Sequence, residues 1–80
     1  MSNIEKYKNI FMETFDLDES QLSGLTYQSI QEWDSVGHMT LISALEDAFD
    51  IMLESDDIIS FKTYEQGLEI LSKEEYGVKF

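Results

Sequence analysis

The 80-residue chain contains no cysteine, no proline and no arginine. The lack of cysteine excludes disulfide bonds, thiolate metal sites, iron–sulfur clusters and a cysteine nucleophile. Because proline is absent and the four glycines are scattered, no stretch has the composition of a linker or a low-complexity segment. No apolar run approaches the roughly 18 residues of a membrane span, and the first residues do not form a secretory signal. We therefore expect one domain over residues 1–80, located in the cytoplasm and without stable membrane insertion.

Positive charge is also scarce. Seventeen acidic residues against five lysines give a formal net charge of −12, and the segment from Asn9 to Phe61 holds twelve acids and no lysine. This charge opposes direct binding to nucleic acid or to an anionic membrane surface and favours basic partners. The concentration of acids in the middle of the chain fits a docking surface, and it fits equally a charge that only keeps the protein soluble.

Hydrophobic periodicity predicts three longer helices. Apolar residues recur three or four positions apart at about 3–15, 35–49 and 63–73. Capping-box patterns mark the start of the first and the last of these helices, Ser-Asn-Ile-Glu at 2–5 and Thr-Tyr-Glu-Gln at 63–66. With 42% hydrophobic residues the chain has enough apolar surface for a core.

The remaining segments complete an all-α prediction. A short helical turn is expected from Ser55, and alternation of β-branched residues is nowhere sustained. Residues 16–34 lack periodicity but carry apolar side chains that we expect to pin this connection to the core. The predicted fold is a small four-helix bundle, three helices longer and one short, with a long loop between the first two helices. The residues expected to face one another in its interior are Met39, Ile42, Leu45, Phe49, Ile58, Tyr64, Leu68 and Leu71.

A catalytic Ser–His pair is one interpretation of the second helix. Ser35 and the only histidine, His38, are three residues apart and could touch on a helix surface. No glycine-rich oxyanion element accompanies them, and so small a chain leaves little room for a substrate pocket. We therefore expect His38 to face solvent and the chain not to be an enzyme.

Ser35 itself has a more informative position. It stands at the predicted start of a helix, directly after Asp34 and a long loop. A hydroxyl there is exposed, and the backbone N–H groups and the dipole of the helix favour a phosphate. Such a serine suits a phosphodiester attachment point, although an ordinary helix cap is the simpler explanation of the same two residues.

The sequence around Ser35 resembles that of acyl carrier proteins. Asp34-Ser35-Val36 is similar to the Asp-Ser-Leu attachment motif of that family, and the order of helices and loop agrees with the family over about residues 3–73. The resemblance implies that Ser35, with Asp34 as its motif neighbour, accepts 4′-phosphopantetheine from coenzyme A. A phosphopantetheinyl transferase supplies the catalytic groups, and the thiol of the arm then carries an acyl group as a thioester.

The resemblance also implies partners. In the family, acidic residues of the second helix meet basic patches on loading ligases and acyltransferases, so the expected partner-binding residues here are Asp34, Val36, Met39, Glu46 and Asp47. The carrier is expected to act as a monomer. The run Trp-Asp-Ser-Val-Gly-His-Met at 33–39 departs from fatty-acid-synthesis carriers and looks more like stand-alone carriers of specialised pathways.

Two alternatives stay open. The first is an aminoacyl carrier protein of the D-alanyl type, which the sequence does not separate from an acyl carrier. The second is an acidic interaction module that binds a basic partner by charge and is never modified.

Overall fold

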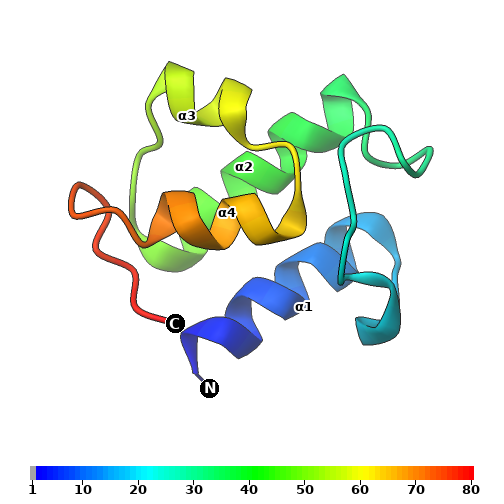
Figure 1. Cartoon of the computed structure of the whole chain (residues 1–80), viewed down its shortest axis with the longest axis horizontal. Helices are drawn as coiled ribbons and strands as arrows, with labels where there is room; N and C mark the ends of the chain where they lie inside the picture. The colour runs from blue at the N-terminus through cyan, green and yellow to red at the C-terminus, as the bar shows by residue number, and fades with distance from the viewer. Residues whose placement is uncertain (1) are drawn as a thin grey trace.

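The computed structural model describes residues 2–80 (Figure 1). In chain order the elements are α1 (Asn3–Phe15), the 3₁₀ turn η1 (Glu19–Gln21), α2 (Ser35–Phe49), α3 (Ser55–Ser60) and α4 (Tyr64–Leu71). Within residues 2–80 the only β-type pairing is one isolated antiparallel bridge, between Thr26 and Thr63. The predicted all-α class is confirmed, including the long loop between the first two helices. The last helix ends two residues earlier than its periodicity suggested.

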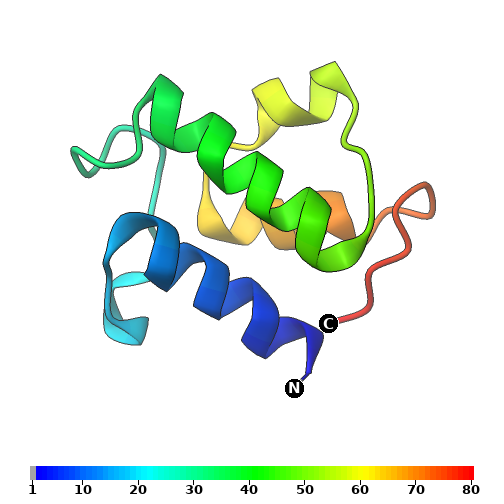
Figure 2. The same cartoon turned by 180° about the vertical axis from the view of Figure 1, so that it is seen from behind.

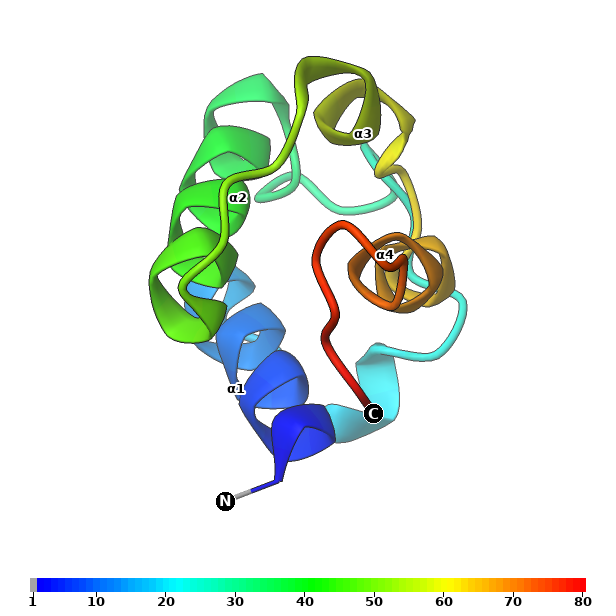
Figure 3. The same cartoon turned by 90° about the vertical axis from the view of Figure 1, so that its left-hand side faces the viewer.

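The helices form two pairs. α1 and α2 pack against each other and run side by side across the face shown in Figure 2. Seen from the side, these two helices make one half of the molecule, and α3 and α4 make the other (Figure 3). The C-terminal segment returns to the start of α1, where the side-chain amide of Asn3 donates to the carbonyl oxygen of Lys79 at 3.0 Å. No helix within residues 2–80 is long and apolar enough to cross a membrane.

Side-chain caps fix where the three longer helices begin. The oxygens of Ser2, Asp34 and Thr63 each accept a hydrogen bond from the backbone N–H three residues later, which satisfies a donor that the helix itself leaves unpaired. α1 and α2 both end on an aspartate in the left-handed conformation, Asp16 at φ 55° and Asp50 at φ 54°. Aspartate is among the few non-glycine residues that adopt this conformation readily.

Aromatic rings dominate the core. Tyr7, Phe11 and Phe15 of α1 are fully buried, and the ring of Phe11 lies 5.6 Å from that of Trp33 and 5.1 Å from that of Tyr64. Of the eight residues predicted to face the interior, Ile42, Leu45, Tyr64 and Leu71 are buried. Phe49, Ile58 and Leu68 are partly buried and pack against the core.

The prediction for the eighth residue, Met39, is wrong: half of its surface is exposed. Met39 stands three positions before Ile42, and three residues are about 60° short of a full turn of an α-helix, so Met39 lies off the buried face of α2. The observed buried face begins with His38 and continues through Leu41, Ile42 and Leu45. Because this face begins with a polar histidine, the hydrophobic pattern does not mark its start.

The loop between α1 and α2 is anchored as predicted. Leu22, Leu25 and Trp33 are buried, and Leu17, Tyr27 and Ile30 pack against the core. Backbone hydrogen bonds tie the loop to the segment before α4: Tyr27 N donates to Lys62 O at 2.7 Å, and Tyr64 N donates to Leu25 O at 2.9 Å. The loop therefore reaches the start of α2 from a fixed direction.

Candidate functional site

Ser35 is the first residue of α2 and is exposed. The carboxylate of Asp34 accepts a hydrogen bond from Gly37 N at 2.8 Å, so the aspartate caps the helix. Among residues 2–80, no side chain or backbone group forms a hydrogen bond with the Ser35 hydroxyl. A Cβ at Gly37 would lie 2.0 Å from the carbonyl oxygen of Glu32, so glycine is required for the loop to lie this close to the first turn of α2.

A cavity of about 340 Å³ opens beside this serine. α2 contributes Ser35, His38 and Met39 to its wall, and α3 contributes Ile58 and Ile59. On the outer face of α2 a shallow groove continues from Ser35 past Val36 and Met39. The side chains of Val36 and Ile59 are 75% and 67% exposed. The serine is therefore surrounded by apolar surface that is open to solvent.

His38 does not face solvent, contrary to the sequence prediction. The indole N–H of Trp33 donates to Nδ1 of His38 at 3.0 Å, and Nε2 lies 2.8 Å from the carbonyl oxygen of Ile58. A carbonyl oxygen can only accept, so Nε2 carries the proton and the ring is the neutral Nε2–H tautomer. The planes of the Trp33 ring and the imidazole are inclined to each other by 18°, as an in-plane hydrogen bond between the two ring edges requires. His38 thus joins the loop, α2 and α3.

These contacts engage both ring nitrogens of His38. Its one acceptor nitrogen is occupied by Trp33, and its other nitrogen is a donor to Ile58. The structure therefore does not contain the Ser35–His38 pair considered from the sequence. The sequence did carry a signal for the role of His38, because positions 38, 41, 42 and 45 follow helical spacing.

The structure divides the five predicted partner-binding residues into two groups. Asp34, Val36 and Met39 lie around Ser35, whereas Glu46 and Asp47 belong to the other end of α2, about 18 Å away at 1.5 Å per residue. Asp47 is exposed. Glu46 is half-buried, and its carboxylate accepts a hydrogen bond from Leu53 N at 2.9 Å. Glu46 thus holds the connection between α2 and α3.

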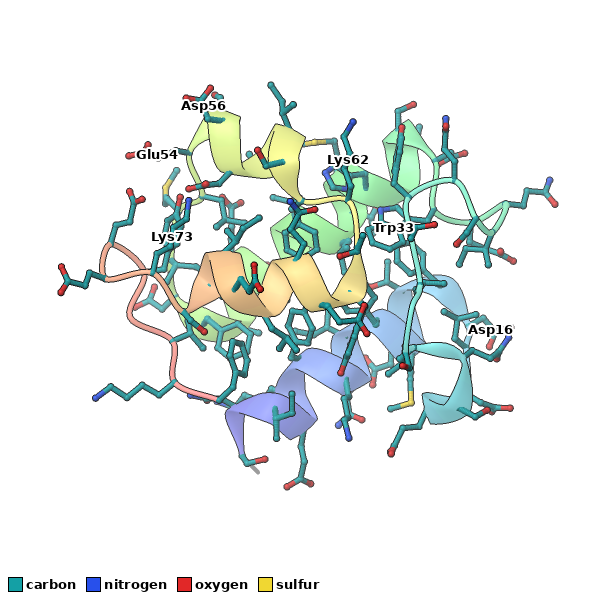
Figure 4. The ribbon with its side chains drawn as sticks, in the orientation of Figure 1. Asp16, Trp33, Glu54, Asp56, Lys62 and Lys73 are labelled. Atoms are coloured by element: carbon teal, nitrogen blue, oxygen red, sulfur yellow. The ribbon has the colours of Figure 1, made fainter. Side chains whose placement is uncertain are left out.

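No pattern in the sequence indicated a buried carboxylate in α3. Asp57 accepts a hydrogen bond from Lys73 Nζ at 2.6 Å and another from the hydroxyl of Tyr76. The hydrogen bond from Lys73, together with that from Tyr76, holds the pKa of Asp57 below its usual range. Burial, followed by the hydrogen bond to Asp57, raises the pKa of Tyr76 to about 12. This cluster fastens the segment after α4 to α3, on the side of Glu54 and Lys73 in Figure 4.

Comparison of the chain with family models, with curated proteins and with solved structures found no match. The function therefore has to be argued from the geometry around Ser35.

Proposed function

We propose that this chain is a carrier protein whose Ser35 bears a 4′-phosphopantetheine arm that holds acyl groups as thioesters for partner enzymes. The observation that carries the proposal is the Ser35 hydroxyl: it is exposed, has no hydrogen-bond partner among residues 2–80, belongs to the first residue of α2, and lies next to an open cavity. An aminoacyl carrier of the D-alanyl type would use the same attachment. The two versions differ only in the group that the loading ligase supplies.

The chemistry of attachment needs an accessible hydroxyl and a base from elsewhere. Ser35 Oγ attacks the phosphorus of coenzyme A that bears the pantetheine group. The new Oγ–P bond forms, the P–O bond of the diphosphate breaks, and adenosine 3′,5′-bisphosphate leaves. The proton of the hydroxyl passes to a base of the transferase, since His38 is occupied by Trp33 and Ile58 and Asp34 caps α2. A serine without a base of its own depends on the transferase to supply one.

The surroundings of Ser35 suit a partner that approaches along α2. Val36 and Met39 offer exposed apolar contacts beside the serine. The net charge of −12 attracts enzymes with basic patches and speeds their association. Glu46 is already bonded to Leu53, so Asp47 is the better candidate for a charged contact near the end of α2.

The proposal is tested by intact mass after incubation with a broad-specificity phosphopantetheinyl transferase, Mg²⁺ and coenzyme A. We expect the mass to rise by one phosphopantetheinyl group in the wild type and not at all in Ser35→Ala. Ser55→Ala is the matched control, because Ser55 is also an exposed first residue of a helix that follows an acid. An unmodified wild type would favour the acidic interaction module, and equal modification of Ser35→Ala would remove the proposed site.

A further inference from the structure

The cavity beside Ser35 has one formally charged wall residue, Lys62. Two ion pairs occur among residues 2–80, Lys8 with Glu19 and Lys73 with Asp57, and Lys62 belongs to neither. No other lysine lies between Asn9 and Lys62 in the sequence. Lys62 is therefore an isolated cation at the edge of a largely apolar cavity, in a protein whose net charge is −12.

The structure holds the backbone of Lys62 firmly. Its carbonyl oxygen accepts from Tyr27 N at 2.7 Å, and its N–H donates to the side-chain oxygen of Gln66 at 3.2 Å. Figure 4 shows Lys62 just past the end of α3. The side chain itself is exposed, so its methylene stem can follow the apolar wall while the ammonium group stays in water. The backbone thus keeps Lys62 at the wall of the cavity, and the ammonium group can reach the opening.

We infer that this cavity receives the carried group and that this group is an acyl chain ending in a carboxylate. The inference rests on the proposed function. The methylenes would pack against Met39, Ile58 and Ile59, and the carboxylate would pair with Lys62 Nζ. Because Ser35 lines the same cavity, an arm that bends back brings its thiol end to the opening.

Size and charge together restrict the group. A volume of about 340 Å³ is at the lower end of the range of ligand pockets, so the cavity can enclose one acyl chain and not a bulkier group. An unsubstituted alkyl chain would gain nothing from Lys62, whereas a terminal carboxylate gains a charged partner at the rim. The acidic residues elsewhere on the surface would repel a carboxylate, so Lys62 would determine where the carboxylate binds.

The phosphodiester on Ser35 is a second anion that Lys62 could reach. The experiment distinguishes pairing of Lys62 with the phosphodiester from pairing with the terminal carboxylate. The transferase is used to load the chain from pentanoyl-coenzyme A or from glutaryl-coenzyme A, whose acyl groups have the same number of carbons. Intact mass verifies loading, and the loss of the acyl group to hydroxylamine is then timed by mass. The variant is Lys62→Gln, and Lys79→Gln is the control, since Lys79 is exposed and also outside both ion pairs.

We expect hydroxylamine to cleave the glutaryl thioester about two- to fivefold faster in Lys62→Gln than in the wild type, the range that corresponds to one rim ion pair. The pentanoyl thioester and the Lys79→Gln control should keep their wild-type rates. Equal acceleration of both thioesters would assign Lys62 to the phosphodiester and overturn the inference, as would no change in either. Failure of the wild type to be loaded at all would instead overturn the carrier proposal and this inference with it.

Discussion

Replacing His38 with leucine tests how the site is held together. The substitution introduces an apolar side chain of similar size and removes both nitrogens, so the indole N–H of Trp33 loses its acceptor and Ile58 O loses its donor. Trp33 is fully buried, and a buried donor without a partner costs about 1–3 kcal/mol. The carbonyl of half-buried Ile58 can turn to water and should add less.

We therefore expect His38→Leu to lower the free energy of unfolding by about 2–3 kcal/mol. A domain of this size has roughly 4–12 kcal/mol in total, so the variant should still fold and remain measurable. Urea denaturation followed by far-UV circular dichroism gives the value. A solvent-facing histidine, as the sequence suggested, would predict a change within about 0.5 kcal/mol.

A double-mutant cycle with Trp33→Phe makes the test specific. In the Trp33→Phe background no indole N–H exists to be orphaned, so His38→Leu should cost about 1–2 kcal/mol less than it does in the wild type. Strict additivity of the two substitutions would refute the hydrogen bond as the source of the stability.

Three further predictions follow from particular contacts. Gly67→Ala should destabilise the fold by about 1–3 kcal/mol in urea, because the added Cβ would meet the Tyr7 hydroxyl oxygen at 2.1 Å; no loss would contradict that packing. The lowered pKa of Asp57 means that its ionised carboxylate stabilises the fold above about pH 4, and this stabilisation is lost on acidification. In Asp57→Asn the urea midpoint should therefore decrease less steeply below that pH than in the wild type. Asp47→Lys should slow loading of Ser35 by the transferase, most clearly at low salt, whereas Glu74→Lys, the same charge change outside α2, should not; equal slowing would indicate long-range attraction alone.

The fold was largely readable from the sequence because its signals are local. Capping residues such as Ser2 and Thr63 mark helix starts within one turn, and the apolar residues of the first loop predicted that the loop would pack against the core. The exposed position of Ser35 followed from the same local reasoning. Its role as an attachment point stays a prediction.

The parts that could not be predicted depend on contacts between distant residues or on polar groups in apolar places. Asp57 and Tyr76 are 19 positions apart, and no local pattern marks either as a partner of the other. His38 was expected at the surface once the catalytic Ser–His pair had been rejected, yet Trp33 and Ile58 give it partners for both nitrogens. Glu46 was interpreted as a docking residue, and only the path of the chain shows that it reaches Leu53 N.

The proposed function requires one phosphopantetheinyl group on Ser35, and peptide mapping of the modified protein shows where the group is attached. Because no lysine lies between Asn9 and Phe61, trypsin would leave Ser35 in one long peptide, so cleavage after glutamate is used instead. Glu32 and Glu46 bracket a peptide, 33–46, whose only serines are Ser35 and Ser43. We expect this peptide to carry the added mass and fragmentation to place that mass on Ser35. Added mass on Ser43, or on any peptide outside 33–46, would show that Ser35 is not the attachment point.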